Sequence, residues 1–566
     1  MKKLTQIIFV LFFINTSTFS YAQPDHPKQQ AVATAHPLAT LAGERILKQG
    51  GNAFDASIAI TAALAVVEPY SSGLGGGGFW MLHQASSNKT IFIDGREKAP
   101  MAATTDMYLD SEGNYIKNSS VNGALAAAIP GTVAALEHLS KHYGKLSLQQ
   151  CLQPAIDLAK NGFKVTKHYQ QMVSFRLELL NQYPVSSKIF LSKNKVPKIG
   201  ELIIQTDLAK TLEKIALQGK KGFYQGEIAQ LLVDAVQQAG GIWSLNDLLN
   251  YQIIERQPIK FNYKGMTIYS APPPSSGGIA LNTILNILKN YPLQQLSAIQ
   301  QKHLIVEAMR RAYHDRAQYL GDSDFIQVPT KKLSSIYYAA GLAASIHPKK
   351  ATPSELLSDY KIEIEGNDTT HFVVLDKEGN CVSSTMSINY PFGSGFTASG
   401  TGILLNDEMD DFSVKPGQAN VYGLVGAKAN EIIAQKRPLS SMSPTYIEYK
   451  TDTEQGIALI GTPGGSRIIT MVLLGLLDIF KDKNPDSWVN LPRFHHQYLP
   501  DFIYYENDTF NAMDIKKLEQ MGHSLKLSKH PYGNMQALWW DQKTGEVNAA
   551  SDQRGEGKAI TFPPSP

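Results

Sequence analysis

The sequence predicts an α+β fold in which a helix-rich first part is followed by a part that begins with strands. Between residues 38 and 340, apolar residues recur mostly at three- and four-residue spacing, which is typical of helices. From residue 371 they alternate with polar residues, as in a half-buried strand. Hydrophobic residues make up 43% and charged residues 18% of the 566 residues, which is a globular composition. The length allows two or three small domains or one large intertwined one.

The first predicted elements are two helices over residues 38–67, separated by GGN. The second of these, AFDASIAITAALAVVE, carries almost no charge, so we expect it to be buried. A loop, SSGLGGGG, leads from it into a strand, FWMLH. Gly73, Gly75 and Gly78 in this loop have the spacing of a dinucleotide-binding fingerprint. That fingerprint must follow a strand and open a helix, and here the order is reversed, so we reject it.

Amphipathic helices are expected to dominate as far as residue 340, with a Pro-rich turn at 271–278. Residues 346–368 are polar, contain two prolines and are expected to form an exposed connector. After the connector, HFVVLD and CVSSTMSIN flank a DKEGN turn, which predicts a β-hairpin. Two further strands, TYIEYK and GIALIG, and a helix after GTPGGS are expected toward the C-terminus.

Residues 1–22 have the features of a secretory signal peptide. Lys2 and Lys3 precede an apolar run of about 8 residues, and small residues Ser20 and Ala22 follow it. The run is far shorter than the roughly 20 residues that span a bilayer. We therefore expect cleavage after Ala22 and a periplasmic or secreted protein without a membrane span.

The charge balance and the cysteines exclude several function classes. Lys and Arg number 53 against 50 Asp and Glu, so no basic excess suggests a nucleic-acid partner. The two cysteines, Cys151 and Cys381, belong to no C-x-x-C motif, which excludes a disulfide scaffold and a structural zinc site. We expect two free buried thiols, with a single disulfide as the alternative. No metal or other cofactor is predicted.

Thr369 follows the polar connector directly and precedes the first strand of the second part. A hydroxyl at a chain start can use its own α-amino group as a base, whereas an internal threonine cannot. Taken alone, these residues favour the simpler interpretation that Thr369 is a β-forming residue at a strand edge. The surrounding sequence decides between these interpretations, because ten blocks in order resemble the gamma-glutamyltransferase family. The blocks are residues 33–56, 66–79, 93–100, 128–137, 272–278, 368–380, 401–417, 420–430, 436–445 and 461–470.

The resemblance implies a precursor that cleaves itself between Asp368 and Thr369. A large subunit, 23–368, and a small subunit, 369–566, would then form a heterodimer. The implied fold is the N-terminal-nucleophile hydrolase αββα four-layer sandwich, built jointly by both subunits. The implied reaction cleaves γ-glutamyl amides such as glutathione through an acyl-enzyme on Thr369. The acyl group passes to water or to an amino acid or dipeptide acceptor.

The resemblance also implies catalytic roles around Thr369. The backbone N–H groups of Gly464 and Gly465 would stabilise the oxyanion, because glycine lets the backbone approach closely. Ser387 stands where the family usually has a second threonine that bonds the nucleophile. Serine keeps the hydroxyl but loses the stiffness of a β-branched side chain, so we expect activity, and the sequence leaves its rate open.

The remaining implied residues bind the γ-glutamyl group. Arg96, Ser440 and Ser441 would hold its α-carboxylate, the arginine through its forked guanidinium. Asn389, Glu408 and Asp411 would hold its α-ammonium. Tyr422 belongs to residues 416–429, which match the loop that covers the substrate in many relatives.

Two other functions stay open at this point. A related acylase would act on glutaryl side chains, as cephalosporin acylases do. Such a substrate has no α-ammonium, so Glu408 and Asp411 would have no role in its recognition. The other is a non-catalytic exported binding protein, which would not need Thr369 at a cleavable chain start. The sequence leaves open the balance of hydrolysis and transfer, the acceptor preference and any further oligomerisation.

Overall fold

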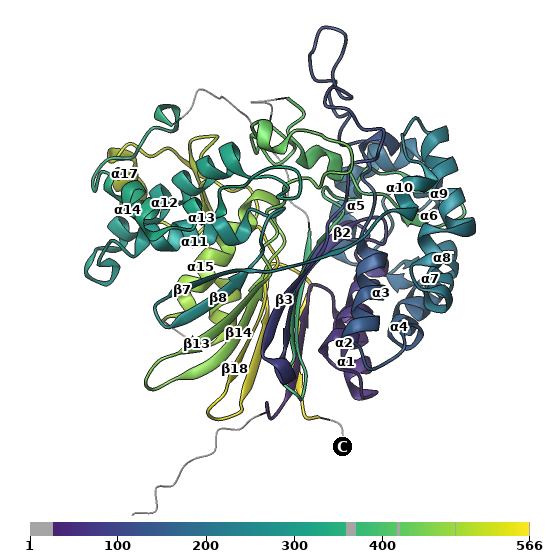
Figure 1. The fold of residues 1–566 in the computed structure, drawn as a ribbon, viewed down its shortest axis with the longest axis horizontal. Helices are drawn as coiled ribbons and strands as arrows, with labels where there is room; N and C mark the ends of the chain where they lie inside the picture. The colour runs from purple at the N-terminus through teal and green to yellow at the C-terminus, as the bar shows by residue number, and fades with distance from the viewer. Residues whose placement is uncertain (1–25, 358–368, 416–418, 482, 565–566) are drawn as a thin grey trace, which may run out of the picture.

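A computed structural model describes residues 26–357, 369–415, 419–481 and 483–564. Two antiparallel sheets face each other at the centre, and helices cover the outer face of each (Figure 1). The predicted signal peptide and residues 358–368 of the predicted connector lie outside the described residues. Within the described residues, no helix is both long enough and apolar enough to cross a bilayer.

The first sheet has seven strands in the order β20–β1–β9–β10–β2–β3–β6. Its strands are β1 (Gln30–Thr34), β2 (Gly77–Gln84), β3 (Lys89–Gly95), β6 (Ile254–Arg256), β9 (Thr370–Leu375), β10 (Cys381–Ser387) and β20 (Lys558–Phe562). The predicted hairpin, β9 and β10, occupies the middle of this sheet. Its four strands β1, β2, β3 and β6 come from before the connector and its strands β9, β10 and β20 from after it, so neither part of the chain forms the sheet alone.

The second sheet has six strands in the order β19–β18–β14–β13–β8–β7. Its strands are β7 (Ile259–Tyr263), β8 (Met266–Ser270), β13 (Thr445–Lys450), β14 (Gln455–Gly461), β18 (Gln536–Asp541) and β19 (Val547–Ser551). Side chains of β2 show how the sheets share the core. Trp80 and Leu82 pack against the helices outside the first sheet, whereas Phe79 and Met81 point into the space between the sheets.

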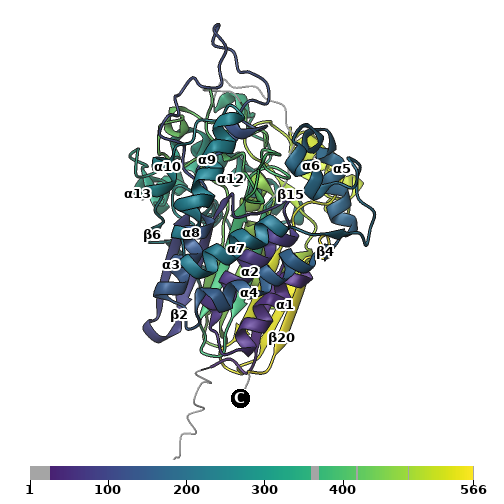
Figure 2. The same ribbon diagram turned by 90° about the vertical axis from the view of Figure 1, so that its right-hand side faces the viewer.

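One helical layer covers the first sheet (Figure 2). It contains α1 (Pro37–Lys48), α2 (Ala53–Val67), α3 (Thr132–His142), α4 (Leu148–Asn161), α5 (Lys167–Gln182), α6 (Pro184–Phe190), α7 (Thr206–Gln218), α8 (Lys221–Tyr224), α9 (Gly226–Gln238) and α10 (Leu245–Leu249). Every residue of α2 is buried, as its lack of charge predicts. Asn52 and Asp55 form a capping box that fixes where α2 begins.

The second helical layer covers the second sheet and completes an αββα sandwich. It contains α11 (Gly277–Leu288), α12 (Ala298–Tyr319), α13 (Thr330–Leu333), α14 (Ile336–Ala344), α15 (Ile468–Ile479), α16 (Pro485–Asn490) and α17 (Ala512–Gln520). Short strand pairs lie outside the layers: β4 (Phe163–Lys164) with β5 (Leu202–Ile203), and β11 (Thr397–Ala398) with β12 (Ile403–Leu404). A small sheet joins β15 (Phe494–His495), β16 (Ile503–Tyr505) and β17 (Leu525–Leu527).

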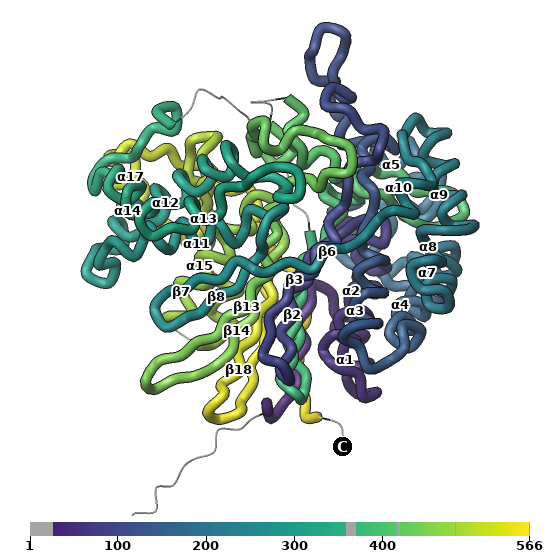
Figure 3. The backbone as a smooth tube through the Cα atoms, in the orientation of Figure 1, coloured from purple at the N-terminus to yellow at the C-terminus, as the bar shows by residue number. Residues whose placement is uncertain are grey.

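Two expectations from the sequence need correction. Residues 254–270 form strands β6, β7 and β8 and not helices, and along β6 the chain crosses from one helical layer to the other (Figure 3). The alternation in IKFNYKGMTIYS is a period-two pattern that the helical interpretation overlooked. The described part of the connector is also not wholly exposed, because Ile346 and Ser354 are buried. Cys151 and Cys381 are buried and free, as expected.

Candidate active site

Thr369 lies immediately before β9, in the middle of the first sheet, and only 5% of its side chain is exposed. In the pairing of β9 with β10, Thr370 lies opposite Met386. Because the register continues by one residue, Ser387 lies across from Thr369. Sheet register therefore brings together the two hydroxyls that the sequence predicted to cooperate.

Thr369 and Ser387 line one small cavity, of about 20 Å³. The cavity lies where the segments that follow β3 and β10 meet those that precede β13 and α15. The other described residues that line it are Arg96, Asn389, Asp411, Tyr422, Leu424, Ser440, Ser441, Met442, Gly465, Ser466 and Ile468. Most of the predicted site residues, from segments more than 300 positions apart, are thus brought together. A volume near that of one water molecule means that little free space is left between these side chains.

The glycine-rich loop after α2 supports this site through close backbone packing. A Cβ atom at Gly75 would lie 2.1 Å from the carbonyl oxygen of Leu404, and one at Gly76 would lie 2.3 Å from that of Ser387. Only glycine fits such distances. The loop runs from a helix into β2, so the rejection of a dinucleotide fingerprint is confirmed.

Arg96 is 1% exposed and is held by two acids from the 3₁₀ turn Glu408–Asp411. Its Nη1 lies 2.7 Å from Oε2 of Glu408, and its Nη2 lies 2.5 Å from Oδ2 of Asp411. Its Nε donates to the carbonyl oxygen of Pro438 at 3.2 Å. Asp411 lines the cavity, whereas Glu408 is completely buried and is not among the described lining residues.

Glu97 is a member of this charge cluster that the sequence analysis missed. Its Oε2 lies 3.5 Å from Nη1 of Arg96, and its side chain is completely buried. Burial raises the pKa of Glu97 to about 7 and raises that of Glu408 well above its usual value. The two acids therefore retain a proton that exposed glutamates would lose. Glu97 directly follows Arg96 in the sequence, and this adjacency could have indicated that Glu97 belongs to the same charge cluster.

The three serines of the cavity share one hydrogen-bonding pattern. The Oγ atoms of Ser387, Ser440 and Ser441 each accept a hydrogen bond from a protein N–H group. The donors are the Asn389 amide (2.8 Å), the Met442 amide (3.0 Å) and the Arg316 guanidinium (3.3 Å), respectively. A hydroxyl that already accepts can turn its own hydrogen elsewhere. All three serines can therefore donate into the cavity, which suits an anionic ligand.

Tyr422 lines the cavity beside Gly465. Its hydroxyl donates to the carbonyl oxygen of Asn389 at 2.5 Å, and a Cβ atom at Gly465 would lie 2.4 Å from its ring. Gly465 has φ +55°, in the left-handed region, and Gly464 has φ +139°. Gly464 is not among the described residues that line the cavity. Residues 416–418 of the predicted covering loop lie outside the described residues.

Asn389 is also held in the left-handed region, with φ +73°. Its side-chain Nδ2 donates to the carbonyl oxygen of Asp407 at 3.0 Å, which leaves Oδ1 as an acceptor at the cavity. A ligand ammonium could bond to that oxygen and to Asp411.

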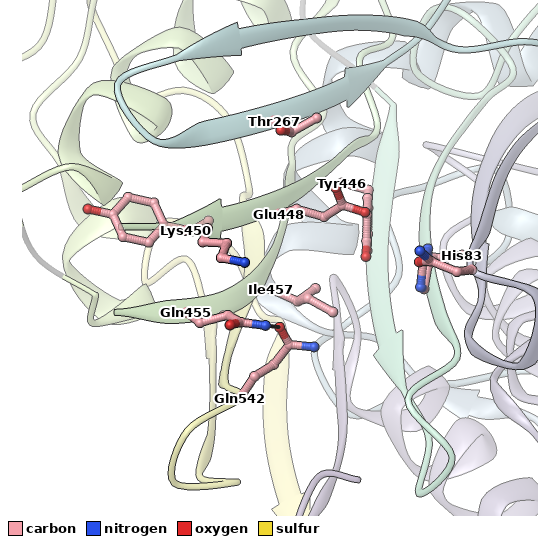
Figure 4. Close-up of a pocket in the computed structure, with 11 residues that line it drawn as sticks. His83, Thr267, Tyr446, Glu448, Lys450, Gln455, Ile457 and Gln542 are labelled. Atoms are coloured by element: carbon pink, nitrogen blue, oxygen red, sulfur yellow. Dashed lines mark hydrogen bonds between the residues drawn. The ribbon is translucent and has the colours of Figure 1, made fainter. Parts of the chain in front are cut away.

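A larger cavity, of about 460 Å³, lies between the two sheets and shares no lining residue with the first. In Figure 4, His83 of β2 faces Tyr446 of β13, and the two rings stack with centroids 4.6 Å apart. Glu448, Gln455 and Gln542 are among the polar residues around it. None of the predicted site residues lies there.

One buried group has the residue types of a metal site. Ligand atoms of His303, Glu307 and His523 lie within 4.8 Å of one another. However, Nδ1 of His303 and Nε2 of His523 form a hydrogen bond of 2.7 Å, and the carboxylate of Glu307 pairs with Arg310 and Arg311. The two arginines lower the pKa of Glu307 to about 2 and already balance its charge. The group is therefore accounted for as a polar network.

The four layers, with a threonine at the head of a central strand, define the class of N-terminal-nucleophile hydrolases. A solved cephalosporin acylase from Bacillus halodurans superimposes with a TM-score of 0.82, at 26% identity, covering 97% of this chain and 99% of its own. A solved gamma-glutamyltranspeptidase from Helicobacter pylori is 42% identical and superimposes with a TM-score of 0.56, covering 57% of this chain and 93% of its own. The predicted αββα fold is confirmed.

Sequence comparison gives the family. The family model described as Gamma-glutamyltranspeptidase matches residues 39–562. A relative from Pseudomonas sp. (strain A14), named glutathione hydrolase proenzyme, is 44% identical over 87% of this chain and 85% of its own length. A relative of the same name from Escherichia coli (strain K12) is 42% identical over 94% and 91%. The chain belongs to the gamma-glutamyltranspeptidase family and is an enzyme of that type.

Proposed function

We propose that this protein cleaves γ-glutamyl amides such as glutathione through a γ-glutamyl ester on Thr369, and passes the γ-glutamyl group to water or to an amino acid or dipeptide. One observation carries the proposal: Thr369 shares a cavity with Arg96 and Asp411, whose opposite charges match the two charges of a γ-glutamyl group. The names of the relatives, glutathione hydrolase proenzyme, support the same substrate and a processed precursor.

Substrate binding would exchange one set of ion pairs for another. Without a ligand, Arg96 bonds to Asp411 directly. The α-carboxylate of the substrate would take over the cavity-facing part of the guanidinium, with donation from Ser440 and Ser441. The α-ammonium would bond to Asp411 and to Oδ1 of Asn389. Glu408 would keep its contact with Arg96.

Self-processing would use the same hydroxyl as catalysis. The Oγ of Thr369 would attack the carbonyl carbon of Asp368, the C–N bond would break, and the acyl group would move to the oxygen as an ester. Water would then hydrolyse the ester, leaving a carboxylate on Asp368 and a free α-amine on Thr369. Ser387, which lies across from Thr369 and has a hydrogen to donate, would orient the attacking oxygen. The products would be the subunits 23–368 and 369–566, held together by the strands that they share.

Turnover would begin when the freed α-amine accepts the Oγ proton as Oγ attacks the γ-carbonyl carbon of the substrate. The oxyanion would face the N–H groups of Gly464 and Gly465. Collapse would break the amide bond, and the departing nitrogen would take the proton from the α-ammonium of Thr369. Water or an acceptor amine would then attack the ester, losing a proton to the same amine, and release the hydroxyl of Thr369.

The test of the nucleophile is the Thr369→Ala variant of the full chain. We expect wild type to give two bands on a denaturing gel, with Thr369 at the N-terminus of the smaller one. Thr369→Ala should stay a single chain and should release no aromatic amine from a γ-glutamyl anilide. Thr369→Ser, which keeps a hydroxyl, should regain both properties in part. Two normal subunits from Thr369→Ala would refute the assignment.

Export of the protein to the periplasm or medium follows from the predicted signal peptide. N-terminal sequencing of the larger subunit tests this in the same experiment. The expected first residue is Gln23, after cleavage at Ala22. A larger subunit that starts at Met1 would contradict export through this signal.

A glutaryl acylase is the second candidate, because the cephalosporin acylase superimposes over nearly the whole chain. Asp411 argues against it, since a glutaryl group has no ammonium to pair with this carboxylate. We expect the enzyme to prefer a γ-glutamyl anilide over a glutaryl anilide by about 10² or more in kcat/KM. Asp411→Asn should narrow this preference. Equal turnover of both donors by wild type would favour the acylase.

A further inference from the structure

Arg316, on α12, lies next to the substrate-binding serines but belongs to none of the ten sequence blocks. Its side chain is 5% exposed. Its Nη2 donates to Oγ of Ser441 at 3.3 Å, and its Nε donates to Oγ of Ser276 at 3.1 Å. Oγ of Ser276 in turn donates to the carbonyl oxygen of Ser440 at 2.8 Å. The guanidinium therefore supports both serines of the predicted carboxylate site.

No described carboxylate lies within ion-pairing distance of Arg316, although it is deeply buried. Two other buried arginines have carboxylate partners: Arg96 pairs with Glu408 and Asp411, and Arg493 pairs with Asp552. Arg176 is the buried arginine that shares the unpaired state of Arg316 among the described residues, and it lines no described part of the cavity. Isolation of a charge from water is costly unless a counter-charge compensates it. The arginine is therefore placed as though an anion completes its surroundings during function.

The charges around the cavity indicate which anion this is. Arg96 pairs with Asp411 and contacts Glu408, so its positive charge already has a counter-charge within the protein. Arg316 forms no ion pair among the described residues, and Asp411 acts on it only from beyond ion-pair distance. Because its N–H bonds to Oγ of Ser441, the hydroxyl hydrogen of Ser441 can point into the cavity. A carboxylate that accepts this hydrogen would also lie in the positive field of Arg316.

We propose that Arg316 is a specificity-determining positioning residue that makes the site select donors with an α-carboxylate, by orienting Ser441 and supplying a positive charge that no direct ion pair neutralises. This rests on the proposed γ-glutamyl function. Arg316 acts through Ser441 and does not touch the reacting atoms, so it should affect the binding of the donor more than the chemical step.

The test compares a γ-glutamyl anilide with a 4-aminobutyryl anilide, which keeps the ammonium and lacks the carboxylate. Arg316→Gln should raise KM for the γ-glutamyl donor about tenfold or more and change kcat less than threefold. It should change kcat/KM for the aminobutyryl donor less than threefold, so that the selectivity falls about tenfold. Arg316→Lys keeps the positive charge but lacks the planar guanidinium with its several N–H donors. It should therefore be more selective than Arg316→Gln and less selective than wild type.

A matched control is Arg493→Lys, a change at another buried arginine whose partner, Asp552, lies outside the cavity lining. This variant should keep the selectivity of wild type even if its stability falls. If the aminobutyryl donor turns over too slowly to measure, selectivity can be taken from inhibition instead. The ratio of the inhibition constants for glutamate and 4-aminobutyrate then reports the preference for an α-carboxylate.

Three outcomes would overturn the proposal for Arg316: equal losses for both donors, a fall in kcat with KM unchanged, or full selectivity in Arg316→Gln. If wild type neither turns over the γ-glutamyl donor nor binds glutamate, the proposed function itself fails. That result is distinct from a loss of selectivity in the variant.

Discussion

The Nη2 atom of Arg96 and the Oδ2 atom of Asp411 lie 2.5 Å apart although 315 positions separate the two residues in the chain. The pair joins the segment after β3 to the turn after β12, at the wall of the cavity that contains Thr369. In the proposed reaction the two charges would bind opposite ends of one zwitterion. The two charges that recognition would use are thus paired with each other in this structure.

Removal of the charge of Arg96 or of Asp411 should reduce activity in both cases. The two variants should, however, differ in their free energy of unfolding. Arg96→Ala leaves Glu408 and Asp411 facing each other without their cation and should destabilise the fold by about 3–5 kcal/mol. Asp411→Ala leaves Arg96 its pair with Glu408 and should cost less. The double variant should be more stable than Arg96→Ala alone, because the unbalanced carboxylate is gone. Thermal midpoints measure this order.

Activity gives a separate readout of the same variants. Loss of a partner of a buried charge should lower kcat/KM on a γ-glutamyl anilide by the equivalent of about 2–5 kcal/mol. Processing needs neither residue and should continue, as a gel of the purified protein would show. Processed variants with nearly wild-type kcat/KM would refute the pocket.

Ser387 should matter through its hydroxyl. Its Oγ already accepts from the amide of Asn389, so its hydrogen can serve Thr369 across the strand pair. Ser387→Ala should slow both self-processing and acylation, because both begin with attack by the same oxygen. Ser387→Thr should be equal or modestly faster, within about tenfold or roughly 1.4 kcal/mol of barrier. Single-turnover acylation rates and processing half-times check both expectations, and an unimpaired alanine variant would leave Ser387 a packing role only.

Gly465→Ala should disturb the position of Tyr422. The new Cβ would lie 2.4 Å from the tyrosine ring, and the backbone is in the left-handed region. We expect at least a tenfold loss of kcat/KM, because either the ring or the N–H groups must shift by a distance that catalysis does not tolerate. Gly113→Ala is the control, since Gly113 also has positive φ but nothing lies within 4 Å of its added Cβ. Equal effects of the two changes on kcat/KM would show that backbone strain alone is responsible.

Glu68 should make stability depend on pH. Its buried carboxylate accepts from the hydroxyl of Thr370, next to Thr369, and burial raises its pKa to about 7. Between pH 4.5 and 7 the folded protein keeps a proton that the unfolded chain releases, so the free energy of unfolding falls as pH rises. The fall due to Glu68 is at most about 3 kcal/mol.

Glu68→Gln should reduce the slope of thermal midpoint against pH in this window. The slope should not vanish, because Glu97, with its pKa also near 7, contributes with the same sign. Glu112→Gln, at an exposed acid, should leave the slope unchanged. A slope in Glu68→Gln identical to that of wild type would contradict the assignment.

Local patterns in the sequence determined much of the fold. The helices α1 and α2, the hairpin of β9 and β10 and the helix after GTPGGS were all predicted within a few residues. Periodicity, helix caps and turns act over a few positions, so they can be read from one segment at a time. The strands at 254–270 were missed because surrounding helices dominated the interpretation of that region.

Ten sequence blocks resemble the family, and this resemblance predicted the residues of the site. Most of these residues line one cavity. Only the tertiary structure decided their partners. It joined Arg96 to Glu408 and Asp411, placed Glu97 in the same cluster and brought Arg316 to Ser441. These contacts depend on the register of β9 against β10 and on the packing of α12 and the loops around the cavity, which no local pattern encodes. Burial then fixed the protonation of the acids, because desolvation depends on everything that surrounds a carboxylate and not on its neighbours in the sequence.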